Sequence, residues 1–290
     1  MQRYVRAISQ MTGPSKDILA SDGCTNSQIM AWIMDEYSHL REFEAPHFIT
    51  GKPLVLGGSQ SRESAAALST VICVEEAAKK IERKIKDARV IVQGFGHTGS
   101  FLAKMLKDRG ATIVGISDAI GGLYDKDGLD IESLLEKRDS FGTVTNLFRN
   151  TITNKDLLES DCDVLVPASV SNQVTKDNAH QVKASLVVEA ANNPITMEAV
   201  KILHDRGVLV VPEVLASSGE SAVSYFESVR NNLGYYWTEE EAAEKIRDKV
   251  VTGFQSVIQT STRYKVDTRL AACIVGVRKT AEASIFRGWF

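Results

Sequence analysis

Three glycines in the middle of the chain have the spacing of a dinucleotide-binding loop. The stretch "VIVQGFGHTGSFLAKML", residues 90–106, joins β-branched residues to an amphipathic segment through Gly94, Gly96 and Gly99. In such a pattern the first glycine permits a tight turn, the second lets the backbone approach a pyrophosphate, and the third lets helix and strand pack closely. The free N–H groups at the start of the helix then face the phosphates. We therefore predict that this loop, with Phe95, binds a dinucleotide.

Asp118 is the candidate ligand of the adenosine ribose. It follows the next apolar run, nineteen residues after Gly99, where an acidic side chain accepts hydrogen bonds from ribose hydroxyls. A carboxylate at this position would repel a 2′-phosphate, so the sequence favours NAD over NADP. The alternative is a βα turn that is tightened by glycine and binds no ligand, since the motif is short.

The histidines and cysteines give no second chemical centre. The ordinary pKa of His97, inside the glycine motif, would allow it to act as a base, but its position favours contact with solvent or phosphates. The other histidines and the cysteines are His39, His47, His180, His204, Cys24, Cys73, Cys162 and Cys273. They have no metal-ligand spacing and form no CxxC pair, so we predict reduced thiols and no metal site.

The elements that must position the glycine loop alternate between helix and strand. Short Val-, Ile- and Leu-rich runs are expected to form strands at residues 88–93, 111–117, 163–167, 185–190 and 207–212. Nearly continuous apolar strands separated by helices are typical of a parallel sheet that is covered on both faces. The predicted fold class is therefore α/β, with a Rossmann-like, doubly wound, mostly parallel sheet and flanking helices at both ends of the chain.

Helical patterns before and after the sheet predict these flanking helices. Thr25 and Gln28 match a capping box in front of a helix that should end near Glu42. Thr238 and Glu241 form the same pattern in front of a long amphipathic helix. We expect the carboxy-terminal helices to fold back onto the amino-terminal ones.

Composition narrows the class of protein. The 290 residues are enough for two domains, and 43% hydrophobic with 24% charged residues is ordinary for a globular protein. A net charge of −3 gives no basic field to attract nucleic acid or an anionic membrane. There is no run of eighteen apolar residues and no secretory leader. The expected location is the cytoplasm.

Several long stretches together resemble the bacterial NAD-dependent glutamate dehydrogenases of the Glu/Leu/Phe/Val dehydrogenase family. They are "GPSKDILASD", "TNSQIMAWIMDEYS", "TGKPLVLGGSQSRESA", "VIVQGFGHTGSFLAKML", "VGISDAIGGLYDKDGLD", "VVEAANNP", "VSYFE" and "GVRKTAEASIFRGW". The resemblance extends over essentially the whole chain. It implies oxidative deamination of L-glutamate with NAD and water to 2-oxoglutarate, ammonia and NADH, in a homo-oligomer.

The resemblance also implies roles for four residues. Asp22, in the family's aspartate loop, would transfer protons between ammonia, water and the reacting carbon, although by itself it could be a loop residue or helix cap. Ser224, in "VSYFE", would hydrogen-bond the distal carboxylate of the substrate, the alternative being an exposed helix serine. Arg62 and Asn192 match family positions near the dinucleotide and the cleft, and Arg62 could equally be a surface ion-pair partner.

The chain also departs from the family pattern. The resemblance places the substrate lysines and the catalytic lysine upstream of the segment that matches residue 1, so we expect the amino-terminal part of the substrate domain to be missing. Ala66 replaces a threonine that would hydrogen-bond the nicotinamide carboxamide, and Glu220 brings a carboxylate close to the expected anionic substrate. The expected domains are a substrate-domain remnant at 1–48, a dinucleotide-binding domain at 49–217 and returning carboxy-terminal helices at 218–290.

Two functions follow from this pattern. The first is a glutamate dehydrogenase-type oxidoreductase, impaired by the missing lysines because they would supply positive charge to the reacting carbonyl oxygen. The alternative is a catalytically silent NAD-binding or assembly protein that co-assembles with a full-length relative. Loss of a packing partner should also expose apolar surface and favour association.

Overall fold

The computed structural model describes residues 1–21, 25–139 and 142–289 and divides the chain into two compact units. Unit 1 comprises Met1–Ala65 and Gly219–Asp248, and unit 2 comprises Ala66–Ser218 and Lys249–Phe290. These boundaries differ from the expected ones. Residues 49–65 belong with the amino-terminal helices, and only the first part of the carboxy-terminal region returns to them.

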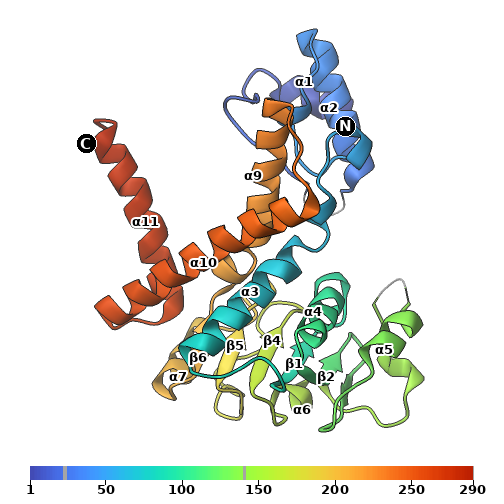
Figure 1. Cartoon of the computed structure of the whole chain (residues 1–290), viewed down its shortest axis with the longest axis vertical. Helices are drawn as coiled ribbons and strands as arrows, with labels where there is room; N and C mark the ends of the chain where they lie inside the picture. Colours follow the sequence, from blue (N-terminus) through green and yellow to red (C-terminus); the bar gives the residue numbers. More distant parts are fainter. Residues whose placement is uncertain (22–24, 140–141, 290) are drawn as a thin grey trace. The chain divides into compact units, whose positions relative to one another are not determined.

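Unit 2 is built on one mixed sheet (Figure 1). Its strands are β1 (Arg89–Gln93), β2 (Thr112–Ser117), β3 (Gly122–Tyr124), β4 (Val164–Pro167), β5 (Leu186–Val188) and β6 (Leu209–Val211). They lie in the order β3-β2-β1-β4-β5-β6, with β3 antiparallel to β2 and the other pairs parallel. The five predicted strands are confirmed. The three-residue strand β3 was not predicted, because it begins with glycine and is too short to show an alternating pattern.

The strand order reverses direction between β1 and β4. The last residues of these two strands, Gln93 and Pro167, are register partners, and the next residue, Ala168, donates its N–H to the Gln93 carbonyl over 2.7 Å. In open α/β sheets, ligands bind outside the carboxyl ends of the strands at this kind of switch point. The glycine motif begins there.

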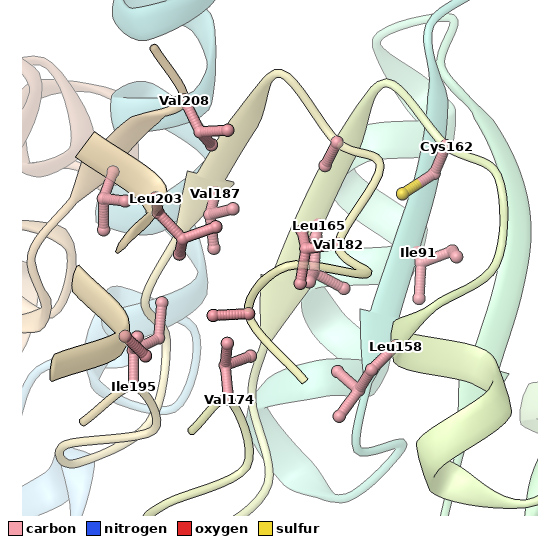
Figure 2. Packing of buried hydrophobic residues seen from close by; sticks show 14 of the residues in the cluster. Ile91, Leu158, Cys162, Leu165, Val174, Val182, Val187, Ile195, Leu203 and Val208 are labelled. Atoms are coloured by element: carbon pink, nitrogen blue, oxygen red, sulfur yellow. The ribbon is translucent and has the colours of Figure 1, made fainter. Parts of the chain in front are cut away.

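Buried side chains from the sheet and the helices α6 (Asn154–Leu158) and α7 (Met197–Asp205) form a core on one face of unit 2. Figure 2 shows Ile91, Leu165 and Val187 of the sheet in this cluster, which also includes Leu158 of α6 and Leu203 of α7. Consecutive strand residues point to opposite faces. The neighbouring Val92 side chain accordingly points to the other face.

The helix α4 (His97–Asp108) packs against β1 and β2 on the face to which Val92 points. It buries Leu102, Ala103 and Leu106, which recur at helical spacing, and it also contacts α5 (Ile131–Lys137). The sheet is thus covered on both faces, as predicted.

Three further helices complete unit 2 together with part of α10 (Glu239–Tyr264): α3 (Ala65–Lys80), α8 (Glu213–Ala216) and α11 (Thr268–Phe286). Buried hydroxyls on α3 donate to the Ala216 carbonyl at the end of α8, Ser69 over 2.7 Å and Thr70 over 3.1 Å. Thr268, at the start of α11, donates its hydroxyl to the Val210 carbonyl of β6. These bonds explain why the last helix belongs to the sheet unit.

Unit 1 contains α1 (Gln2–Ile8), α2 (Ser27–Arg41) and α9 (Ser218–Leu233), with short 3-10 turns at Pro46–Phe48, Leu54–Leu56 and Gln60–Arg62. Its small core is formed by Val5, Met30, Ile33 and neighbouring apolar residues, and includes the stacked rings of Tyr37 and Phe48 with centroids 3.6 Å apart. The amphipathic pattern of the amino-terminal helices therefore produces a buried face.

The helix boundaries confirm two of the three expected signals. Asn26, rather than Thr25, caps α2, because its side chain accepts the N–H of Ile29 over 3.0 Å. The helix ends at Arg41, and its C-cap is Glu42, which has a left-handed φ of 59°. The Thr238 capping box is present, with reciprocal bonds of 2.8 and 3.2 Å between Thr238 and Glu241.

Candidate functional site

The three motif glycines form a tight junction between β1 and α4. Gly94 has a φ of +102°, and a Cβ there would lie 2.9 Å from the Ala168 carbonyl. A Cβ on Gly99 would lie 1.7 Å from the Gly94 carbonyl oxygen. Glycine is therefore required at both positions, the first for backbone conformation and the second for close packing. The structure confirms this part of the sequence argument.

Gly96 has different surroundings, and these fit a bound dinucleotide. Among the described residues, a Cβ on Gly96 would meet no atom within 4 Å. Gly96 is also the N-cap of α4 and supplies no side-chain cap to the helix. The first turn therefore has backbone donors and positive dipole charge beside open space, which suits a pyrophosphate.

Asp118 directly follows β2, but its carboxylate is already bound by the protein. Oδ1 accepts from Ile120 N, Gly121 N and Thr145 Oγ1 over 2.8, 3.2 and 2.6 Å, and Oδ2 accepts from Val144 N and Thr145 N, both over 2.8 Å. Burial raises the pKa of this carboxyl, but the bonds from Thr145, Val144 and Ile120 outweigh it and lower the pKa overall. Asp118 is thus an ionised structural acceptor, a role that the spacing argument missed.

Two residues a short distance before Val144 and Thr145 in the chain, Arg138 and Gly142, lie at the glycine loop. Arg138, at the end of α5, donates from Nη1 to the Gly96 carbonyl over 2.9 Å and to the Ser100 hydroxyl over 2.6 Å. Gly142 lies so close that its Cβ would be 3.0 Å from the Gly96 Cα. Neither residue was predicted from the sequence, since both are distant from the motif in the chain.

The other residues predicted near the dinucleotide have simpler surroundings. The side chain of Phe95 is fully buried, so only its backbone is available to a ligand. Asn192 is exposed, and its carbonyl accepts the Ser171 hydroxyl over 2.8 Å. The His97 ring packs edge-on against Phe101 with centroids 5.2 Å apart.

Arg62 lies in unit 1 and contacts the predicted substrate residue. Its Nη1 donates to Ser224 Oγ over 2.9 Å, and its Nη2 donates to Ser21 Oγ over 2.8 Å. Arg62 and Ser224 therefore belong to unit 1, whereas the glycine loop belongs to unit 2. Asp22, the expected proton-transfer residue, follows Ser21 directly but lies outside the described residues.

A buried ion pair lies beside this cluster. Lys52 Nζ is 2.7 Å from Glu227 Oε1, and both side chains are 0% exposed. Glu227 is one helical turn from Ser224 on α9, and it also accepts the N–H of Gly51 over 3.0 Å. Burial lowers the pKa of Lys52, and the charge of Glu227 opposes this effect. The sequence offered one signal for this pair, a lysine between glycine and proline in "TGKP".

The same helix binds the following loop at two more points. Asn231 donates to the Gly57 carbonyl over 2.9 Å, and Arg230 donates to the Gly58 carbonyl over 3.4 Å. Thus α9, which carries Ser224, and the loop that leads to Arg62 are joined by buried polar contacts. This arrangement fixes the two side chains relative to each other.

Glu189, directly after β5, is a second buried charge that the sequence argument did not name. It is 0% exposed, pairs with Arg269 of α11, and accepts the Glu213 N–H over 3.0 Å. Burial raises the pKa of Glu189 to about 7, although the positive charge of Arg269 opposes the shift. The pair ties α11 to the carboxyl edge of the sheet.

Among residues 1–21, 25–139 and 142–289, no group of three His, Cys, Asp or Glu side chains could hold a metal ion. In the same ranges, the helices include none that is long and apolar enough to cross a bilayer.

The sheet order and the glycine junction define a doubly wound α/β protein of the Rossmann type. Residues 57–288 match the model of Glutamate/Leucine/Phenylalanine/Valine dehydrogenase, and residues 1–39 match that of the Glu/Leu/Phe/Val dehydrogenase dimerisation domain. The chain belongs to the Glu/Leu/Phe/Val dehydrogenase family.

Individual relatives agree with the expected resemblance. The chain is 65% identical to the catabolic NAD-specific glutamate dehydrogenase RocG of Bacillus subtilis, over 99% of this chain and 68% of that protein. It is 62% identical to the NAD-specific glutamate dehydrogenase of Staphylococcus aureus, over 99% of this chain and 69% of the relative.

Solved structures show the same fold. The hetero-hexameric glutamate dehydrogenase of Thermus thermophilus, in its Leu-bound form, has a TM-score of 0.91 and 33% identity, covering 99% of this chain and 68% of its own. Glutamate dehydrogenase from Peptoniphilus asaccharolyticus has a TM-score of 0.88 and 34% identity. The match covers 100% of this chain and 70% of the Peptoniphilus chain.

Proposed function

We propose that this chain is a glutamate dehydrogenase-type oxidoreductase that uses NAD to convert L-glutamate and water to 2-oxoglutarate and ammonia. The observation that carries the proposal is the open space at Gly96 beside an uncapped helix start, at the switch point of the sheet. The high identity to NAD-specific glutamate dehydrogenases supports the choice of both substrate and cofactor.

The proposed roles divide between the two units. In unit 2, the backbone of Gly94, Gly96 and the first turn of α4 would hold the dinucleotide phosphates, and NAD, when bound, accepts the hydride. In unit 1, the Ser224 hydroxyl and the Arg62 guanidinium would bind a substrate carboxylate. The two Arg62 nitrogens that now contact serine hydroxyls have the fork geometry that pairs with a carboxylate.

Asp22 keeps its proposed role as the proton-transfer residue. It follows Ser21, whose hydroxyl contacts Arg62. A carboxylate at this position would take protons from water or ammonium and return them as the reacting carbon changes between amine and ketone. Asn192 is retained as a proposed cofactor contact through its exposed side chain.

The second candidate function is a catalytically silent NAD-binding protein, and the lysines of unit 1 favour it. Lys52 is fully buried and paired with Glu227, Lys16 donates to the Gln10 carbonyl over 3.3 Å, and Lys245 lies 4.8 Å from the Trp237 ring centroid. These are all the lysines in that unit. Each lysine of unit 1 is thus engaged within the chain, and in this second candidate function none supplies positive charge to the reacting carbonyl oxygen, where an oxyanion develops.

Two measurements on the purified chain separate the candidates. With NADH, ammonia and 2-oxoglutarate, the oxidoreductase produces a fall in absorbance at the NADH band that requires all three substrates. A silent NAD-binding protein shows NADH binding by fluorescence titration with no such fall. Absence of NADH binding at millimolar concentration contradicts both functions. Asp22→Asn, which keeps the size of the side chain, should abolish turnover and leave NADH binding unchanged.

We further propose that the chain assembles with itself or with a full-length relative. The match of residues 1–39 to a dimerisation domain supports this, as do the exposed apolar side chains on α1 and α2, among them Tyr4 and Trp32, which are 54% and 53% exposed. Sedimentation velocity of the chain alone and mixed with such a relative tests both forms of assembly.

A further inference from the structure

The carboxylate of Asp118 has little capacity left for a ligand. A carboxylate presents about four lone-pair directions, and Asp118 accepts five donors from its own chain. Both oxygens have short partners, Thr145 Oγ1 at 2.6 Å on Oδ1 and Val144 N at 2.8 Å on Oδ2. A ribose hydroxyl would have to displace one of these bonds or share its acceptor.

The residues that Asp118 binds form one end of a short connected segment. Asp139 accepts the N–H of Thr143 on its side chain over 2.7 Å and the N–H of Gly142 on its carbonyl over 3.0 Å. These bonds join residues 142–145, on the Asp118 side, to Arg138. We call Arg138, Asp139 and residues 142–145 the Arg138 segment.

The other end of the Arg138 segment lies against the glycine loop. The Arg138 guanidinium donates to the Gly96 carbonyl and the Ser100 hydroxyl, and a Cβ on Gly142 would lie 3.0 Å from the Gly96 Cα. Among the described residues, all of these Arg138 contacts use Nη1. The guanidinium therefore places a full positive charge at the start of α4, where the helix already favours an anion.

We propose that Asp118 is a positioning residue that holds the Arg138 segment against the glycine loop, and that Arg138 contacts the dinucleotide at its pyrophosphate. The inference rests on the proposed binding of NAD and changes the assignment of its contacts. Asp118 then acts on affinity without touching the ribose, and it does not set the choice between NAD and NADP.

Binding measurements with three variants test this assignment. Thr145→Val removes the hydroxyl donor to Asp118 and no other polar group, and Asp118→Asn places an amide against the N–H groups of Val144 and Thr145. Both variants should weaken the binding of NADH and of NADPH by the same factor. The ratio of the two affinities should therefore stay within about twofold of its value in the unmodified chain. Thr151→Val is the matched control, because Thr151 is exposed, lies outside the Arg138 segment and makes no described bond to Asp118.

Arg138→Gln distinguishes the pyrophosphate contact. Loss of a charge-assisted hydrogen bond should lower the affinity for NADH and for ADP about tenfold or more and leave the affinity for adenosine unchanged. An equal loss of affinity for adenosine would overturn the proposed contact between Arg138 and the pyrophosphate. An Asp118→Asn variant that shifts preference toward NADPH, with Thr145→Val unaffected, would overturn the positioning role and restore Asp118 as the ribose ligand.

Hydrogen–deuterium exchange without any ligand gives a second readout. Asp118→Asn and Thr145→Val should speed exchange of the amides at 142–145 and at 94–100, while Thr151→Val leaves both unchanged. Unchanged exchange at 94–100 in the first two variants would contradict the positioning role. If the unmodified chain fails to bind NADH, the proposed function and the Arg138 contact are both wrong, whereas exchange still decides the role of Asp118.

Discussion

At the scale of single residues, charges that are removed from water organise unit 1. Lys52 and Glu227 are both fully buried, and Glu227 Oε2 has no hydrogen-bond partner in the described part of the chain. Each charge is therefore compensated mainly by the other. A buried pair of this kind adds little stability compared with apolar residues, but removal of one partner leaves an uncompensated charge.

Lys52→Met should therefore lower the free energy of unfolding by about 3 kcal/mol, and Glu227→Gln by a similar amount. The double variant should lose less than the sum, because neither charge is then left alone. Urea unfolding followed by tryptophan fluorescence in a Trp289→Phe background reports on unit 1, which contains Trp32 and Trp237. Additive losses would show that the two charges do not stabilise each other.

At the scale of elements, the β1–α4 junction assigns separate tasks to its glycines. Gly99 has no space for a side chain, because its Cβ would overlap the Gly94 carbonyl. Gly96 has space and a φ of −70°, which any residue can adopt. Packing therefore requires glycine at Gly99. At Gly96 the packing of the described residues does not require glycine, whereas the proposed dinucleotide would.

A matched pair of substitutions tests this division. Gly99→Ala should cost roughly 3 kcal/mol or more of unfolding free energy, since the junction must open. Gly96→Ala should change the free energy of unfolding by less than about 0.5 kcal/mol. It should lower the affinity for NADH about tenfold or more, because the methyl group occupies the space through which the pyrophosphate would approach. Unchanged NADH affinity in Gly96→Ala would remove the argument for a ligand there.

At the scale of the whole molecule, the chain passes between its units three times, each time at a helix. The crossings follow Ala65, Ser218 and Asp248, which lie in α3, α9 and α10. Each unit is therefore built from segments that are distant in the chain. In unit 2 the last segment, α11, is held to the sheet by the Glu189–Arg269 pair, so the stability of the unit depends on the protonation of Glu189.

The pKa of Glu189 is raised to about 7 in the folded chain, from an ordinary value of 4.5. Between these values the folded chain binds a proton that the unfolded chain releases. This contribution to stability is full below pH 4.5 and falls by roughly 3 kcal/mol as the pH rises to about 7. Urea unfolding followed by circular dichroism at pH 5 and pH 7.5 measures the change.

Glu189→Gln is the control for this prediction, because it does not titrate. Asp118 and Asp163 have lowered pKa values, so their stabilisation is lost only at more acid pH. Burial lowers the pKa of His47 from 6.5, which raises stability with pH in this interval, but this effect is common to both chains and cancels in their difference. The stability difference between the unmodified chain and Glu189→Gln should therefore change with pH in this direction. A constant difference would show that Glu189 stays ionised beside Arg269.

Much of the fold could be predicted, because strand and helix signals are local. The apolar runs predicted five strands, and Gly94 and Gly99 have the backbone and packing roles that the motif assigns to them. The site was predicted less completely. Arg138 and Lys52 contact residues 42 and 175 positions away, and no local pattern encodes such contacts.

The sequence by itself determined the α/β class, the glycine junction and the membership of the family, since periodicity and motif spacing are properties of neighbouring residues. Only the tertiary structure decided which charges are paired. It bound the Asp118 oxygens to backbone donors from residues 144 and 145, joined Arg62 to Ser224, and buried Lys52 against Glu227. The physical reason is that hydrogen bonding and desolvation depend on which distant segments the packed elements bring together.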